Sequence, residues 1–486
     1  MTQFHSATKR TRVLRTAAWL LAGCALFSPN TSLAQALLAP TDDTASTTAA
    51  TTTVGTVAAP AVVPSAETTG SISTEAGEPL FTGPTVDEDM ARTNLRENSV
   101  DGLRQQLNIA EDAATGIRLG SFVLKPTLGQ TFNFEKTKTG DDTESRSYLE
   151  TGLKGTLTSD WSRHELSITG EGTWQRNVSG SGETEPTADL QAVLRLDISR
   201  ETTGTLKAGY HFEREDADDP NAIANATSQS DVNQYTLGAG IEHDFGILRG
   251  SAKVDFDRYT YGDVDLDNGT TLSRDDRDRN EGALTLRVGY ELSPALIPFL
   301  EGSAGRSIYD LRQDTLGFER SYDNYGLRAG IEADLGEKLS GEIALGYETY
   351  RFDDSRLDEL GGVTIDGLVN WSPQRGTNIT YGVSTGLEPS TTPGESGALT
   401  YTLSSNGTHE LRSNLLARWS NSLTFRNYPS GSFSGDEKVW MTGAGLTWDV
   451  NRTLALTGDV SYERTNRDLG PSTDTARIGV GLTLRR

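Results

Sequence analysis

Cysteine, methionine and long hydrophobic runs are all scarce in this chain of 486 residues. It contains one cysteine, Cys24, and three methionines, so it has neither a disulfide framework nor a C-x-x-C motif. No stretch of about 18 apolar residues occurs, which excludes a transmembrane helix. The one remaining structure that could span a membrane is a closed β-barrel, because lipid offers open strand edges no hydrogen-bond partner.

Apolar residues and basic residues are also few. Only 35% of the chain is hydrophobic and the mean hydropathy is −0.46, which is lean for several soluble cores of this total size. The composition suits strands in which only every second residue is apolar. Lysine and arginine number 44 against 68 acids, a net charge of −24, and so acidic a chain is a poor partner for nucleic acid.

Residues 1–34 have the pattern of an export signal. Four bases between residues 9 and 15 precede the short apolar segment Thr16–Phe27, and Ser32–Ala34 forms a cleavage site of small residues. An alternative is a lipoprotein box, LAGC, ending at Cys24. The apolar run continues past Cys24, which favours the ordinary signal peptide and places the mature chain in the cell envelope.

Two segments separate this signal from the rest of the chain. Residues 35–85 are rich in threonine, alanine and serine, and we expect a disordered linker there. Residues 86–116 carry apolar positions at near-helical spacing, which indicates a short periplasmic segment with a possible amphipathic helix. That segment is either a linker whose helix is unstable alone, a helix that docks a periplasmic partner, or a plug of a lumen.

From residue 117 to residue 486 the apolar residues alternate with polar ones in strand after strand. The stretch LALTGDVSYERT, Leu454–Thr465, sets apolar or small residues against Asp459, Ser461 and Glu463 on the other face. The segments Tyr235–Phe245 and Ala283–Leu292 repeat the pattern. We count about 18 such strands, the even number that bacterial barrels require. The predicted fold is all-β: a transmembrane, antiparallel, up-and-down β-barrel over residues 117–486.

The connections between these strands alternate between long and short. HDFGILRG, DLGEKLS and WDVNRT are short, whereas REDADDPNAIANATSQS and DLRQDTLGFERS are long, and TKTGDDTES places a long one first. Transmembrane barrels have long loops outside the cell and short turns in the periplasm. Both mature termini are therefore expected in the periplasm.

The polar face of the strands decides which face meets lipid. So many charged residues in a packed soluble core would cost several kcal/mol each unless paired, whereas a water-filled lumen removes that cost. We therefore expect the apolar face to contact outer-membrane lipid. Trp440 and Trp448 lie eight residues apart on one apolar face, and with Tyr290, Trp371 and Phe245 they predict aromatic girdles at the two membrane surfaces.

Several of these stretches resemble the putative beta-barrel porin 2 family of alphaproteobacterial outer membranes. They are GIRLGSFVLKPTLGQTFNFEKT, SDWSRHELSITGEGTWQR, LGAGIEHDFGILRGSAKVDFDRYTY and the ending ARIGVGLTLRR. The resemblance implies an outer-membrane barrel with a poorly defined substrate, and some such barrels are thought to serve polysaccharide export. The chain departs from common porins at its end, where Arg485 and Arg486 stand in place of a terminal aromatic residue.

The same alternation predicts which side chains line the pore. The expected lumenal residues are Glu171, Arg195, Lys207, His211, Lys253, Asp255, Arg287, Glu291, Arg328, Glu332, Asp334, Glu342, Arg418, Arg426, Asp459 and Glu463. Acids outnumber bases modestly in this set, and acidic loops add to them at the mouth. A confined negative field concentrates cations, so we expect a mild cation preference.

Catalytic chemistry finds little support in the sequence. His211 is expected in the lumen, where Glu213 and Glu215 could orient it, but no Ser–His–acid arrangement can be asserted. The stretch that begins at Asp263 resembles a calcium loop, yet Asn268 and Arg274 replace its glycine and glutamate. We predict no enzymatic activity, no metal site and no cofactor.

Three functions remain open. The first is a porin-like channel for passive passage of small hydrophilic solutes or ions. The second is an export barrel for polysaccharide that works with a periplasmic partner through residues 86–116. The third is a non-transporting surface scaffold or adhesin that presents acidic loops.

Overall fold

The computed structural model describes residues 115–486, except for residues 181, 183, 216–222, 224–225, 268, 315, 393 and 430–434. The predicted signal peptide (1–34), the linker (35–85) and nearly all of the segment 86–116 lie outside the described residues. Within them, no helix is long and apolar enough to cross a membrane.

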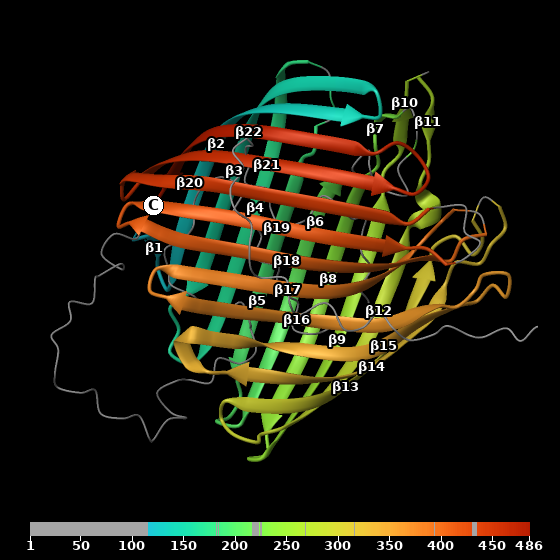
Figure 1. Ribbon diagram of the computed structural model, residues 1–486. Helices are drawn as coiled ribbons and strands as arrows, with labels where there is room; N and C mark the ends of the chain where they lie inside the picture. The colour runs from blue at the N-terminus through green and yellow to red at the C-terminus, as the bar shows by residue number, and fades with distance from the viewer. Residues whose placement is uncertain are drawn as a thin grey trace, which may run out of the picture. The chain divides into compact units, whose positions relative to one another are not determined.

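The described chain forms a closed antiparallel barrel of 18 strands, as the alternation predicted (Figure 1). Each strand pairs with its neighbour in the chain, and β22 pairs with β2 to close the ring. The strands are β2 (Phe122–Thr139), β3 (Asp142–Ser159), β4 (His164–Ser179), β5 (Thr187–Asp197), β6 (Thr202–Arg214), β8 (Asp231–Asp244), β9 (Leu248–Tyr261), β12 (Arg279–Tyr290), β13 (Leu296–Tyr309), β14 (Tyr322–Asp334), β15 (Leu339–Phe352), β16 (Leu360–Gln374), β17 (Thr377–Pro389), β18 (Gly397–Arg412), β19 (Leu415–Asn427), β20 (Glu437–Asn451), β21 (Leu454–Arg467) and β22 (Thr473–Arg485).

Short elements complete the two ends of the barrel. Strand β1 (Ile117–Leu119) folds back on the start of β2. Strands β7 (Ala226–Ser228), β10 (Val264–Leu266) and β11 (Thr271–Leu272) form a separate three-stranded sheet beyond the other end (Figure 1). The acidic stretch from Asp263 therefore contains the β10–β11 hairpin of this sheet. Two single-turn 3-10 helices, η1 (Asp275–Arg277) and η2 (Gly336–Lys338), lie in connections.

The two faces of the strands differ as the sequence pattern predicted. In β21, Leu456 is exposed on the outer face, whereas Ala455, Thr457 and Asp459 are buried on the other. In β14, Tyr325, Leu327 and Ile331 are exposed in the same way. An apolar face exposed along strand after strand suits a surrounding of hydrocarbon rather than water.

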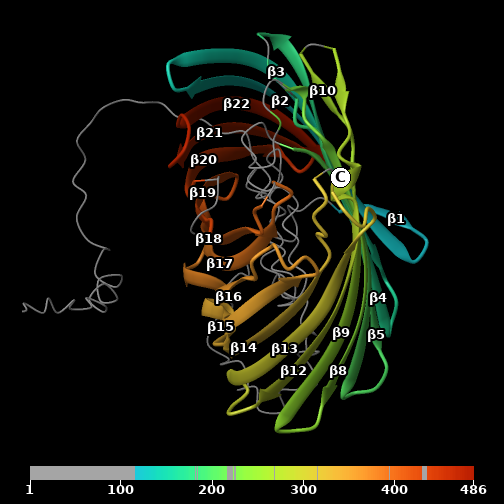
Figure 2. The same ribbon diagram turned by 90° about the vertical axis from the view of Figure 1, so that its right-hand side faces the viewer.

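Long and short connections lie at opposite ends of the barrel. At the short-turn end, connections such as 375–376 and 452–453 join strands by two residues. At the long-loop end, which faces the reader in Figure 2, lie connections such as 310–321 and 428–436. The prediction of a long first connection is wrong, because Thr139 pairs with Asp142 and a tight turn at Gly140 joins β2 to β3. These strands are 18 residues long, so the polar residues taken for a loop extend the ladder instead.

Aromatic residues lie near both ends of the outer face. Trp174, Tyr235 and Trp440 are exposed toward the long-loop end. Trp448 and Trp371 are exposed toward the short-turn end, as are Tyr290 and the turn residue Phe245. The outer face thus has the aromatic belts that flank the apolar band of membrane barrels.

The barrel wall bends sharply where β12 to β15 meet (Figure 2). Glycines occupy inward positions on this bend. A Cβ atom at Gly346 would lie 2.5 Å from the Cβ of Arg328, and one at Gly330 would lie 2.5 Å from the Cζ of Phe299. Neighbouring side chains therefore lie directly over these glycines, and the bend requires residues without a side chain there.

Candidate functional site

Ion pairs between strands that are not neighbours identify the concave face of the barrel. Arg287 on β12 contacts Glu342 on β15, with its Nη1 2.9 Å from Oε2 of the glutamate. Its Nε donates to Glu301 on β13 at 2.6 Å. Side chains on strands three apart can meet only across the inside of a curved sheet. The inner face of these strands therefore carries charges that contact one another.

Glu301 extends this contact into a belt of five charges. Its other oxygen accepts a hydrogen bond from the Nε of Arg328 at 2.6 Å. Arg328 also reaches β16, where its Nη1 lies 3.1 Å from Asp366. The charged belt is thus Glu342–Arg287–Glu301–Arg328–Asp366, with three carboxylates and two guanidinium groups. It leaves this part of the wall with a net negative charge.

A second group of inward charges lies on β17 to β21. Arg418 and Asp459 are 2.5 Å apart across β20, and Arg426 lies 2.8 Å from Glu388 on β17. Arg426 also pairs with Glu437 on β20. All of these are short, charge-assisted contacts that hold the inner side chains in place.

The seam of the barrel has its own ion triad. Glu135 on β2 accepts hydrogen bonds from Arg146 on β3 and Arg477 on β22, each at 2.6 Å. It thereby joins the first and last strands of the ring on the inner face.

The remaining predicted pore residues are distributed over the inner register of the other strands. Glu171 lies 3.3 Å from Lys154, Arg195 3.1 Å from Asp197, and Glu291 3.7 Å from Arg249. A Cβ at Gly238 would contact both Lys207 and Asp255, so these two side chains flank one position. Lys253, Glu332, Asp334 and Glu463 occupy inward register positions as well, with Asp334 exposed at the short-turn end.

His211 is held by two carboxylates. Its Nδ1 lies 3.2 Å from Asp189 and its Nε2 lies 3.3 Å from Glu213. Glu213 therefore contacts the ring as the sequence suggested, but Glu215 pairs with Arg277 instead. Each ring nitrogen therefore lies next to a carboxylate oxygen that can accept a hydrogen bond from it.

Inward aromatic residues near the long-loop end were missed by the sequence analysis. Tyr322 stacks on Tyr350 with ring centroids 4.6 Å apart, and both pack with Tyr309 in one cluster. The hydroxyl of Tyr322 donates to Glu281, which is paired with Arg279 at 2.7 Å. The prediction placed aromatic residues on the lipid face, although strict alternation from Tyr325 would have turned Tyr322 inward.

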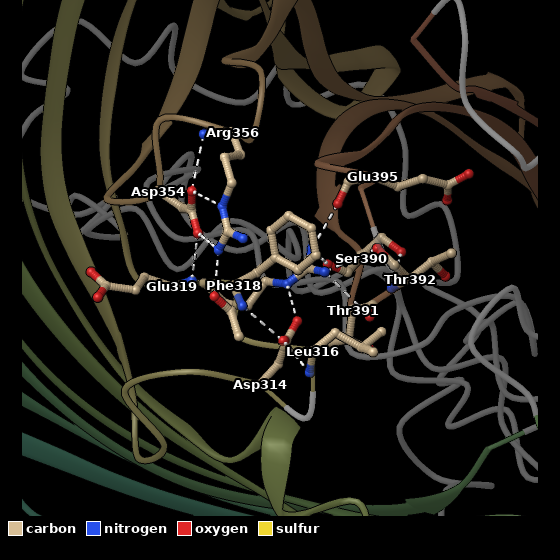
Figure 3. A network of polar contacts seen from close by, with 12 residues as sticks. Asp314, Leu316, Phe318, Glu319, Asp354, Arg356, Ser390, Thr391, Thr392 and Glu395 are labelled. Atoms are coloured by element: carbon tan, nitrogen blue, oxygen red, sulfur yellow. Dashed lines mark hydrogen bonds and ion pairs between the residues drawn. The ribbon is translucent and has the colours of Figure 1, made fainter.

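Two loops at the long-loop end are tied together by Arg320, whose partners Asp314, Ser390, Thr392 and Glu395 are labelled in Figure 3. This residue lies in the connection 310–321, is 1% exposed, and donates its Nε to Asp314 at 2.9 Å. Its Nη1 donates to the backbone oxygens of Ser390 and Glu395, each at 2.7 Å. Its Nη2 donates to the oxygen of Thr392 at 2.9 Å. One guanidinium group therefore binds the connection 390–396 to the connection 310–321.

The third loop, residues 353–359, joins through Asp354 and Arg356 (Figure 3). Asp354 accepts the backbone N–H of Glu319 at 3.0 Å, and Arg356 donates to the backbone oxygen of Gly317. Hydrogen bonding from Arg356 holds the pKa of Asp354 well below its ordinary value. We call the three connections together the loop clamp. They lie within the ring of strands when the barrel is seen from the long-loop end (Figure 2).

Comparison with known proteins identifies the family. The family model described as "Putative beta-barrel porin 2" matches residues 112–486. The chain belongs to this family. The match begins just before β1 and includes every strand of the barrel. It is thus an outer-membrane β-barrel of the porin type, as the resemblance implied.

Several solved structures show a partial likeness to this porin-family chain. OpdL of Pseudomonas aeruginosa is 14% identical, covering 74% of this chain and 99% of that one, with a TM-score of 0.36. OpdK of the same organism is 13% identical, with coverage of 75% and 99% and a TM-score of 0.37. The siderophore receptor PirA, also from P. aeruginosa, is 11% identical, with coverage of 75% and 80% and a TM-score of 0.37. These values are too low to transfer anything to this chain. No curated protein matches it.

The inner wall of this porin-family barrel carries charged side chains that are held in place by their mutual contacts. Many of its inner charges form pairs and chains, and within the described residues no group of three or more His, Cys, Asp or Glu side chains is placed to hold a metal ion. An inner wall of fixed charges interacts with passing ions through its field.

Proposed function

We propose that the protein is a passive channel for small hydrophilic solutes and ions, with a mild preference for cations. The observation that supports it best is the closed 18-strand ring with apolar residues outside and chains of charges inside. A ring of this size is wide enough to enclose an aqueous path. The charged belt supplies one more carboxylate than guanidinium groups, which favours cations.

We further propose an orientation in which the long-loop end faces the outside of the cell. Long loops outside and short turns in the periplasm are the rule for outer-membrane barrels. Residues 115 and 486 then both lie on the periplasmic side, since β1 and the end of β22 are at the short-turn end. The loop clamp would lie at the outer mouth and narrow it.

Single-channel recording tests this function directly. The refolded full-length protein, added to a planar bilayer in KCl, is expected to produce discrete conductance steps. Reversal potentials in a KCl gradient should show a preference for K⁺ that weakens as the salt concentration rises and the Debye length shortens. Absence of conductance from protein that has the barrel fold would refute the channel. An anion-selective reversal potential at low salt would refute the cation preference.

A further inference from the structure

The outer face at the long-loop end carries basic residues just beyond its apolar band. In β2, the exposed residues Phe132 and Phe134 are followed in the same register by Lys136 and Lys138, both exposed. In β20, the exposed Lys438 comes two residues before Trp440. In a chain with a net charge of −24, bases gathered at one place on the outer face need an explanation.

Strand pairing brings these bases together across the seam of the barrel. Lys138 is directly opposite Asp474 on β22, and Asp474 is directly opposite Arg464 on β21. Directly opposed residues have Cβ atoms about 4.5–5.5 Å apart, so the three positions lie in one short row. Lys438 is opposite Asn466, two residues along from Arg464, on the next strand. We call Lys136, Lys138, Lys438 and Arg464 the basic rim patch.

The acid within this patch is already engaged. Asp474 accepts a hydrogen bond from the hydroxyl of Tyr462 at 2.5 Å and lies 3.6 Å from Arg464. Among the described residues, none of the three lysines of the patch forms an ion pair. One carboxylate for four bases leaves the basic rim patch with an excess of positive charge.

Three outward arginines elsewhere at the same end are neutralised by acids. Arg258 makes two contacts of 2.6 Å with Asp310, and Arg306 contacts Asp353 at 2.8 and 2.6 Å. Arg351 lies 3.4 Å from Glu359. These three arginines are matched by carboxylates, whereas the lysines of the basic rim patch are not.

We propose that the basic rim patch binds the phosphate groups of a phosphorylated lipid in the surrounding leaflet. The ligand must be amphiphilic, because exposed Phe132, Phe134 and Val480 lie on the membrane side of the lysines. Its hydrocarbon chains would pack on these residues while its phosphate meets the lysine ammonium groups. Trp440 and Tyr462, whose ring centroids are 5.8 Å apart, lie at the boundary where aromatic residues contact lipid headgroups.

Lipid retention measured by native mass spectrometry tests the proposal. Full-length protein in nonionic detergent is titrated with diphosphoryl lipid A and, separately, with zwitterionic phosphatidylcholine. A lysine near an anionic lipid surface contributes about fivefold to binding. The variant Lys136→Gln/Lys138→Gln/Lys438→Gln is therefore expected to bind the phosphorylated lipid about a hundredfold more weakly and phosphatidylcholine unchanged.

Two matched variants make the outcome specific. Arg258→Gln/Arg306→Gln/Arg351→Gln removes three outward bases that are already neutralised, and it should bind the phosphorylated lipid like the wild type. The variant Lys136→Arg/Lys138→Arg/Lys438→Arg, which keeps the three positive charges, should also bind it. Equal loss in both glutamine variants, or no loss in either, overturns the proposal. Displacement of the lipid by millimolar inorganic phosphate would also overturn it, in favour of a site for free phosphate.

The test is independent of channel activity. The inference uses the membrane placement of the proposed function, but lipid binding in detergent requires neither a conducting pore nor a known orientation. Each variant is first checked for the folded barrel by its altered mobility on an unboiled SDS gel. Loss of lipid binding in a conducting protein, or the reverse, separates the two proposals.

Discussion

At the residue scale, the loop clamp depends on the buried guanidinium group of Arg320. All of its nitrogens donate, to one carboxylate and to backbone oxygens of another loop. Lysine could not replace it, because a single ammonium group cannot reach this fork of acceptors. The acceptors belong to two different connections. The side chain therefore supplies hydrogen bonds between loops that are not joined by a β-ladder.

Replacing Arg320 by alanine should release the loops without unfolding the barrel. Each buried acceptor left unsatisfied costs about 1–3 kcal/mol, and every 1.4 kcal/mol is about tenfold in an opening equilibrium. Hydrogen exchange at the amides of Leu316 and Phe318 is therefore expected to accelerate at least about tenfold. Arg312→Ala, which removes an exposed arginine of the same loop, should leave exchange unchanged. Equal acceleration in both variants would contradict the role assigned to Arg320.

The loop clamp should resist acid down to low pH. Burial raises the pKa of Asp314, but hydrogen bonds from the Phe318 amide, Arg320 and the Leu316 amide outweigh it and hold the pKa below the ordinary value of 3.8. A lowered pKa stabilises the folded loops above that ordinary value, and the contribution is lost as pH falls through the folded pKa. Exchange protection, corrected for intrinsic rates, should be constant from about pH 5 to pH 8 and fall only below 3.8.

The variant Asp314→Asn serves as the control for this acid response. It keeps an oxygen that can accept the two amide hydrogen bonds but cannot titrate in this range. Its protection should be lower at neutral pH and nearly independent of pH in acid. A loss of wild-type protection near pH 6 would show that another group governs the loops.

The sequence predicted on which face of its strand a side chain lies, but it did not predict with which residue that side chain forms an ion pair. Alternation turned Arg287 and Arg328 inward because the apolar residues beside them are outward. Their shared partner Glu301 follows the same rule in β13, where Leu300 is exposed, and could have been included. The contact of Arg287 with Glu342 could not have been predicted from the sequence, because it depends on how sharply the barrel wall bends between β12 and β15.

At the element scale, each strand is an alternating element whose register was predictable and whose ends were not. The polar residues around Gly140 have the composition of a loop, yet they extend the β2–β3 ladder to its last pair. A ladder continues past the membrane when its backbone groups remain paired, whatever the side chains. Composition therefore predicts which part of a strand spans the membrane, but it does not predict how far the strand continues beyond the membrane.

The depth of an outward residue in the membrane should determine how much a charged substitution there lowers the free energy of unfolding. Leu327 lies mid-strand in β14 and Leu335 lies in the following turn, and both side chains are 60% exposed. Leu327→Arg should destabilise the barrel by about 2–4 kcal/mol, and Leu335→Arg by about 0–1 kcal/mol. Urea unfolding in lipid vesicles, followed by tryptophan fluorescence, measures both. Similar costs at the two positions would contradict the assignment of the membrane band.

At the scale of the whole molecule, closure of the ring is the property that governs stability. The pairing of β2 with β22 leaves the barrel no open edge. The full-length protein should therefore resist SDS until it is boiled, and unboiled and boiled samples should migrate differently on a gel. Identical mobility together with a helical circular dichroism spectrum would contradict the closed barrel.

The sign of the inner field is a prediction that follows from composition, whereas the positions of its charges depend on contacts between side chains. Glu332 is directly opposite Glu342 on the inner face of β14 and β15. Arg287 neutralises Glu342, and within the described part of the chain Glu332 forms no ion pair of its own. An inward carboxylate without such a partner adds negative charge to the field of the inner wall.

Removing that charge should weaken the cation preference. In a KCl gradient at low salt, the reversal potential of Glu332→Gln is expected to shift toward that of a non-selective pore, while single-channel conductance steps persist. Asp323→Asn provides the control, because this carboxylate lies on the outer face of β14 and pairs with the outward Arg306 at 3.2 Å. At about 1 M salt the Debye length is about 3 Å, so the wild type and both variants should converge. An unchanged reversal potential in Glu332→Gln, or an equal shift in both variants, would show that the selectivity arises elsewhere than on the inner wall of β14.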